Sequence, residues 1–208
     1  KRQTTLGWWD RFQTADGLAP AAARVAVAAS LLGAVLFFGG AVGTSTVTIH
    51  NGLGRPVAVT FGEQTLQLGA FAHRLIEVPQ DAHYAVTTKT ASGATIERFE
   101  VDTLGQFSHY VYNIAGAAPL VEWTATYGNA EARAPQSLGA PRWTNTRAEH
   151  VFEDPPDDVR TKSGGATRSV LSAVANDHPV RVLESAGSDA TRDDVLAAHA
   201  RWDSAQSP

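Results

Sequence analysis

Residues 25–42 form an uncharged apolar segment, VAVAASLLGAVLFFGGAV, which limits the folds open to this chain more than any other feature. At about 1.5 Å per residue, a helix of this length extends roughly 27 Å, close to the hydrocarbon thickness of a bilayer. A helix buried in a soluble domain is rarely apolar on every face over such a length. The sequence therefore predicts one transmembrane helix over residues 20–43.

Basic residues are distributed unequally around this segment. Those that precede it are Lys1, Arg2, Arg11 and Arg24, and no Lys or Arg follows it before Arg55. Because positive charge favours the cytoplasmic side, residues 1–19 are expected to be a cytoplasmic or interfacial segment. Everything after Gly43 would then lie outside. We expect a bacterial inner-membrane protein with a periplasmic or extracytoplasmic C-terminal part.

Two sets of residues follow from this helix. The residues expected to make the membrane anchor are Arg24, Val25, Leu31, Leu32, Leu36, Phe37, Phe38 and Val42. Small residues that could let a second helix approach closely are Ala22, Ala26, Ala29, Gly33, Gly39 and Gly43. Residues 41–43 also fit a signal-peptide cleavage site, but the apolar run is longer than a usual signal core, which favours an uncleaved signal-anchor.

Residues 44–128 change to an apolar period of two, interrupted by Gly-, Pro- and Asn-containing turns. Seven or eight short strands without intervening helices are typical of an antiparallel, Ig-like β-sandwich, with a small barrel as the alternative. Parallel pairs are not expected, since there is no room for crossover helices. The predicted core comprises Val57, Val59, Phe61, Leu66, Leu68, Phe99, Val101, Tyr110, Tyr112, Ile114, Val121, Trp123 and Tyr127.

The remaining chain is expected to be a mostly irregular tail. Residues 129–165 are rich in Pro and Gly and read as a linker, and residues 166–208 read as a short helical tail. Its two helices are predicted from Thr167 and over Ser188–Gln206, with an extended piece at Val180–Leu183. Two short helices need a surface to pack on, so a protein partner or a second copy of the chain is expected. Candidate contact residues are Trp143, Phe152 and Trp202.

The sequence carries no recognisable catalytic or metal-binding motif. It has no cysteine, no GxSxG or SxxK, and no metal-type histidine spacing. His50 and His109 are expected on outward strand faces, where they could be neighbours. The net charge of −4 is scattered along the chain, which argues against a nucleic-acid partner. We predict no catalytic residue, no metal and no cofactor.

These features favour a single-pass membrane-anchored structural or interaction module outside the cytoplasm, as an accessory part of a larger membrane protein or assembly. The alternative is an extracytoplasmic sensor subunit that binds a ligand or glycan, with the aromatic stretch 107–123 as its candidate contact. An enzyme with dispersed catalytic residues is the third hypothesis.

Overall fold

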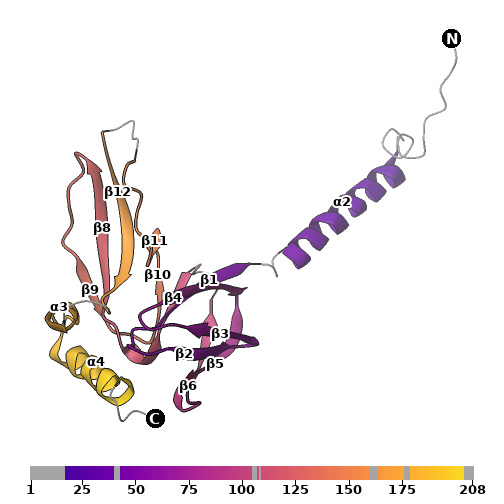
Figure 1. The fold of residues 1–208 in the computed structure, drawn as a ribbon. Helices are drawn as coiled ribbons and strands as arrows, with labels where there is room; N and C mark the ends of the chain where they lie inside the picture. Colours follow the sequence, from indigo (N-terminus) through magenta and orange to yellow (C-terminus); the bar gives the residue numbers. More distant parts are fainter. Residues whose placement is uncertain are drawn as a thin grey trace. The chain divides into compact units, whose positions relative to one another are not determined.

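A computed structural model describes residues 17–39, 43–104, 107, 109–159, 164–175 and 179–203. Two compact units make up the chain, Lys1–Gly43 and Thr44–Pro208. Most of the second unit is β-structure, in three four-stranded sheets with few helices (Figure 1).

The first unit contains helix α2, Leu18–Gly39, which begins two residues before the predicted span and ends four before its predicted end. From Ala19 to Ala34 its side chains are mostly exposed, among them Val25, Leu31 and Leu32 at 69, 64 and 61%. In the part of the chain that the structure describes, no helix combines the length and apolarity needed to cross a membrane. The transmembrane span over 20–43 is thus unsupported by the structure and stays a prediction.

Several anchor residues cannot be placed. Val42 and the side chains of Leu36, Phe37 and Phe38 lie outside the described residues. Among the small residues, the exposure of Gly39 also lies outside the described part of the structure. Those found exposed on α2 are Ala22, Ala26, Ala29 and Gly33. A Cβ at Gly33 would meet nothing within 4 Å. Helix–helix packing on this face therefore stays a prediction.

Two of the sheets share one hydrophobic core. Sheet A has the order β10-β7-β1-β4, and sheet B has the order β3-β2-β5-β6. The strands of sheet A are β1 (Thr44–His50), β4 (His73–Pro79), β7 (His109–Asn113) and β10 (Trp143–Thr146). Those of sheet B are β2 (Val57–Phe61), β3 (Gln64–Leu68), β5 (Ala82–Thr90) and β6 (Thr95–Thr103). Their alternating apolar residues meet between the sheets, as in a sandwich.

The predicted core is largely confirmed in these two sheets. The residues found buried are Val57, Val59, Phe61, Leu66, Leu68, Val101, Tyr110, Tyr112 and Ile114, and Phe99 packs against them. Val121, Trp123 and Tyr127 are not in this core, because β8 (Leu120–Gly128) belongs to a third sheet. The expectation of purely antiparallel pairing is wrong, since β1 pairs in parallel with β7. The connection between β1 and β7 runs through the intervening strands, so no crossover helix is needed.

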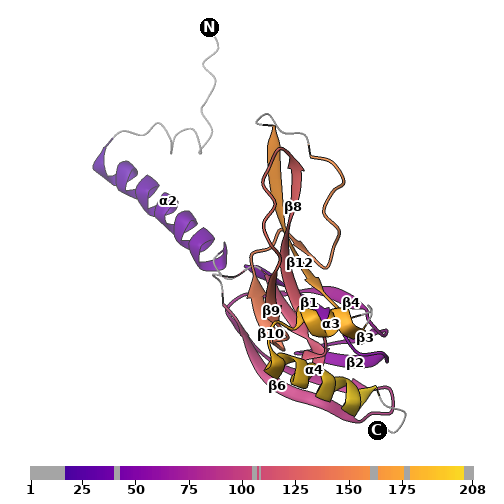
Figure 2. The ribbon, with the colours of Figure 1, turned by 90° about the vertical axis from the view of Figure 1, so that its left-hand side faces the viewer.

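Sheet C has the order β11-β12-β8-β9. It combines β8 with β9 (Gln136–Gly139), β11 (His150–Val151) and β12 (Gly165–Ala173). Strands β8 and β12 form an antiparallel ribbon that extends beyond the other strands of the domain (Figures 1 and 2). Val111, on the other face of sheet A, packs with Leu120, Val151 and Leu171 of sheet C in a second, smaller core. Sheet A is therefore covered on both faces.

The C-terminal part departs from the predicted tail. The helix predicted from Thr167 is wrong, since this segment is β12, and the expected linker contains β9, β10 and β11. Residues 180–183 are helical, within α3 (Pro179–Ser185). The second helix is confirmed as α4, Asp189–Trp202, which Ser188 caps by accepting a hydrogen bond from the Thr191 N–H at 3.2 Å.

Helix α4 packs on the β-domain of its own chain. Trp202, 4% exposed, lies in the core shared by sheets A and B. Next to it, the Asp203 carboxylate accepts the Gly54 N–H at 3.0 Å, and Arg55 donates to the Trp202 carbonyl at 2.8 Å. His199 contacts the Ala117 carbonyl at 2.8 Å through Nε2. The surface that this helix was expected to need is provided by the chain itself.

Candidate functional site

Two histidines lie opposite each other where β1 and β4 pair. The register sets His50, the last residue of β1, against His73, the first residue of β4. His50 is only 5% exposed, and neither of its ring nitrogens has a hydrogen-bond partner among the described residues. Buried polar groups are almost always hydrogen-bonded, and leaving one unsatisfied costs about 1–3 kcal/mol. His50 is therefore the polar side chain whose position the packing alone does not explain.

Two phenylalanines with strained backbones stand beside these histidines. Phe71 (φ 54°) and Phe152 (φ 57°) are both in the left-handed region, which bulky residues rarely adopt. Such conformations cost about 1–3 kcal/mol each and gather at ligand-binding and active sites. Hydrogen bonds hold both backbones in place, from Phe71 N–H to the Leu53 carbonyl (3.2 Å) and from Phe152 N–H to the Leu171 carbonyl (2.8 Å). The Phe152 ring centroid lies 4.9 Å from that of His50 and 5.6 Å from that of His73.

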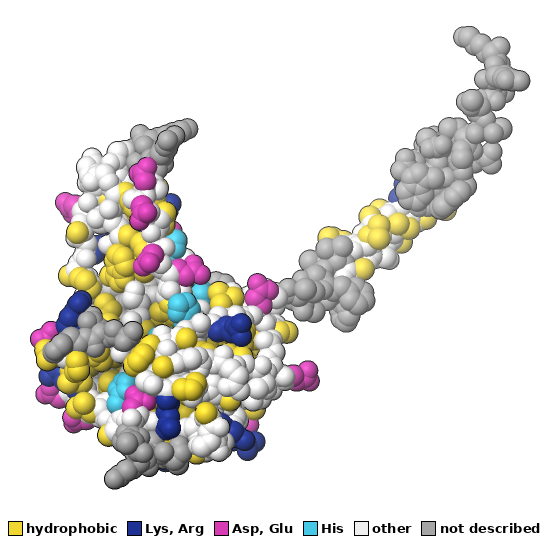
Figure 3. Space-filling view, in the orientation of Figure 1, with side chains coloured by type: hydrophobic (Ala, Val, Ile, Leu, Met, Phe, Trp, Pro, Cys, Tyr) yellow, Lys and Arg dark blue, Asp and Glu magenta, His cyan; other side chains and the backbone are white. Residues whose placement is uncertain are grey.

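These four residues line a hollow of about 240 Å³, here called the His50 hollow. Its remaining lining residues are Glu153, Asp154, Ser172, Ala173 and Ala175. Glu153 and Asp154 follow the strained Phe152 directly, and both are exposed. Among the described residues, no Lys or Arg lines the hollow, so its charge is negative. On the face of the β-domain that Figure 3 presents, several histidine and acidic side chains lie close to one another.

Burial controls the protonation of the histidines here. Burial, with a smaller contribution from the nearby His73, lowers the pKa of His50 from 6.5 to about 4. His109, which contacts the Thr48 hydroxyl at 2.8 Å, also has a lowered pKa because it is half-buried, although the Glu153 charge opposes this shift. At neutral pH the His50 imidazole is thus neutral, with one N–H donor and one lone-pair acceptor.

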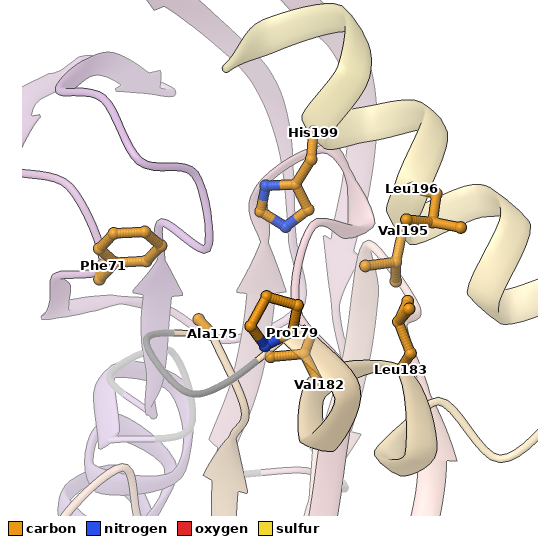
Figure 4. A pocket seen from close by; sticks show the side chains of 8 residues that line it. All are labelled: Phe71, Ala175, Pro179, Val182, Leu183, Val195, Leu196 and His199. Atoms are coloured by element: carbon orange, nitrogen blue, oxygen red, sulfur yellow. The ribbon is translucent and has the colours of Figure 1, made fainter. Parts of the chain in front are cut away.

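A second hollow, of about 350 Å³, adjoins the first at Phe71 and Ala175. Figure 4 shows how residues of α3 and α4 line it together with these two. Apart from His199, its lining is apolar: Phe71, Ala175, Pro179, Val182, Leu183, Val195 and Leu196. Both nitrogens of His199 are already used, by the Asp203 carboxylate at 2.6 Å and the Ala117 carbonyl at 2.8 Å. This second hollow offers apolar contact and little polar recognition.

A buried polar network on the other side of α4 has a structural explanation. The Glu97 carboxylate accepts hydrogen bonds from the Tyr112 hydroxyl (2.8 Å) and the Ala115 N–H (2.7 Å), and Arg142 lies 3.6 Å away. Burial raises the pKa of Tyr112 well above 10, so its hydroxyl stays protonated and donates. Ala115 lies in the turn that follows β7 and has φ 56°. Its hydrogen bond to Glu97 helps to hold this turn in place.

Histidine–carboxylate pairs do occur, but they are not arranged for catalysis. His83 contacts Asp102 at 2.7 Å and Glu100 at 3.3 Å, so acids occupy both its nitrogens, as acceptors occupy both in His199. Neither imidazole has a nitrogen left for a nucleophilic hydroxyl. Within the described ranges, no group of three or more His, Asp or Glu residues is placed to hold a metal ion.

The structure places the histidines and the candidate contact residues predicted from sequence at separate positions. His50 and His109 are not neighbours, since His50 pairs with Asn113 and His109 with Thr46 across β1 and β7. Both are covered rather than outward-facing, because β11 and β12 lie over this face of sheet A. Trp143 stacks between Phe61 and Tyr110 (6.0 and 5.1 Å), and Trp202 is buried. Of the three candidate contact residues, only Phe152 lines the His50 hollow.

Sequence reasoning missed most residues of this hollow, among them Phe71, His73, Glu153 and Asp154. His73 begins a strand and Phe71 precedes it in a loop, with no pattern that marks either as a site residue. Asp154 was interpreted as part of a Pro-rich linker. Known proteins give no further guidance, since no family model, no curated protein and no solved structure matches this chain significantly.

Proposed function

We propose that this chain is a membrane-anchored binding module whose β-domain, outside the cytoplasm, takes a small ligand in the His50 hollow. The observation that carries the proposal is the combination of a buried, unpartnered His50 with two aromatic residues held in strained conformations around it. Proteins tolerate the free-energy cost of an unsatisfied polar group or a strained backbone where a bound molecule offsets it. The role favoured from sequence alone, a scaffold contacting other chains through its tail, loses one argument because α4 packs on its own domain.

Support for the anchor comes from the uncharged apolar sequence of residues 25–42 and from the exposure of Val25, Leu31 and Leu32. Apolar side chains exposed around a helix are unfavourable in water and favourable in lipid. The distribution of basic residues supports an extracytoplasmic position for the β-domain.

Charging the middle of α2 tests the anchor. Leu31→Arg with Leu32→Arg is expected to move the protein from the membrane fraction to the alkaline-carbonate-soluble fraction, because each arginine costs about 2.5–3.5 kcal/mol at the centre of a span. The matched control is Val180→Arg with Leu196→Arg, two residues of similar exposure in the folded domain. If the control alone changes the fractionation, or if the native chain is carbonate-soluble, the anchor proposal is wrong.

The absence of cysteine allows a clean test of orientation. A single Gln67→Cys on the exposed side of β3 is expected to react with a membrane-impermeant maleimide in intact spheroplasts, without background labelling. A Thr4→Cys variant is expected to react only after the membrane is permeabilised. The reverse labelling pattern would contradict the predicted orientation.

Ligand binding is tested with the full chain in nanodiscs and a panel of soluble amines, sugars, alcohols and carboxylates. We expect at least one class to shift the imidazole NMR signals of both His50 and His73, since both line the hollow. The imidazole of His83, exposed on β5, serves as the internal control. A panel that leaves both signals unchanged would argue against a binding role.

A further inference from the structure

We infer that the ligand of the His50 hollow is a small organic cation bearing a primary ammonium group. This inference rests on the proposed binding function and adds the chemical class of its ligand. It depends on three properties of the hollow, namely its charge, its aromatic faces and the one buried acceptor that has no partner.

The charge of the lining residues indicates the sign of the ligand's charge. Glu153 and Asp154, both exposed, line the hollow, and no Lys or Arg among the described residues lines it. His50 supplies no compensating charge at neutral pH, because burial keeps its ring neutral. An anionic ligand would meet two like charges, whereas a cation would be paired with both acids.

The aromatic rings add to this preference. The π-faces of Phe71 and Phe152 carry partial negative charge and attract ammonium groups within about 6 Å of the ring centroid. The strained backbone of Phe152 also positions Glu153 and Asp154, which follow it directly. Aromatic and acidic residues therefore line the same hollow.

His50 selects a cation that can donate hydrogen bonds. A neutral imidazole has one nitrogen with a free lone pair, and in His50 neither nitrogen has a partner among the described residues. A primary ammonium has three N–H donors, enough for this lone pair and for the two carboxylates. A quaternary ammonium has none and would leave the imidazole unsatisfied. The hollow of about 240 Å³ limits the ligand to a small molecule.

The test compares four probes of similar size on the full chain in nanodiscs: n-butylammonium, tetramethylammonium, n-butanol and butyrate. The readout is the imidazole NMR signals of His50 and His73, titrated at pH 7.5. We expect n-butylammonium to bind at least tenfold more tightly than each of the other three. Glu153→Gln with Asp154→Asn is expected to weaken its binding at least tenfold, and His50→Phe is expected to weaken it while the fold is retained.

Glu63→Gln, at the exposed β2–β3 turn, is the control for a loss of negative charge away from the hollow and is expected to bind as the native chain does. Tighter binding of tetramethylammonium, n-butanol or butyrate would overturn the ammonium assignment and leave the binding function standing. A signal change produced by Zn²⁺ but not by n-butylammonium would likewise overturn it. No response to any probe or to the wider panel would overturn the inference and the function together.

Discussion

Lowering the pH from 7.5 to 4.5 is expected to reduce the free energy of unfolding by about 2–3 kcal/mol through His50 alone. Burial lowers the pKa of this residue from 6.5 to about 4, so between these values the unfolded chain binds a proton that the folded chain does not. The contribution of His50 to the free energy of unfolding is therefore fully present above about pH 6.5 and decreases as the pH falls toward 4. His109, with its pKa lowered by burial, contributes in the same direction.

The measurement is urea denaturation of the native chain and of His50→Leu at both pH values. All other titratable groups are common to the two proteins, so the difference between the two pH dependences isolates His50. Since leucine replaces two unsatisfied nitrogens by apolar atoms, the variant is expected to be at least as stable as the native chain at pH 7.5. Equal losses of stability in the two proteins would show that His50 is not buried as a neutral ring.

Truncating Trp202 is expected to have the largest effect of any single substitution considered, with Trp202→Ala costing about 3–5 kcal/mol. The indole is buried in the core shared by sheets A and B, so its removal leaves a cavity that the two sheets cannot close. It also weakens the attachment of α4, because the contacts of Asp203 with Gly54 and of Arg55 with the Trp202 carbonyl depend on the helix being in place.

Denaturation monitored by circular dichroism gives the global value, and amide exchange of residues 195–203 reports on α4 itself. Leu196→Ala, in the same helix but half exposed, is the matched control and is expected to cost under about 1 kcal/mol. Loss of exchange protection in α4 of Trp202→Ala, with protection kept in β1, would localise the damage. A cost for Trp202→Ala similar to that of the control would contradict the packing described for α4.

The sequence predicted the strands of sheet B well because each of them buries one alternating face. Val57, Val59 and Phe61 point into a core while their neighbours do not, and period two is clear in such strands. The same reasoning failed at β12, where Val170 and Leu171 are consecutive and both are buried. A strand covered on two faces loses its alternation, and at this length its apolar residues also fit a helix.

The candidate site was beyond sequence reasoning for a different reason. The alternation in β1 correctly placed His50 on the face opposite the core of sheets A and B. However, this face is covered by a segment that ends in Phe152, about a hundred positions further along the chain. Nothing local indicates that Phe71 and Phe152 adopt positive φ, since bulky aromatic residues disfavour it. The hollow is therefore a product of tertiary contacts alone.

The hydrogen bonds from Gly54 to Asp203 join residues 149 positions apart. A ribosome must therefore synthesise almost all of the described chain before the loop after β1 can find its final contacts, and the early strands wait with an incomplete core. During that interval, chaperones would have access to apolar surface that the finished domain conceals.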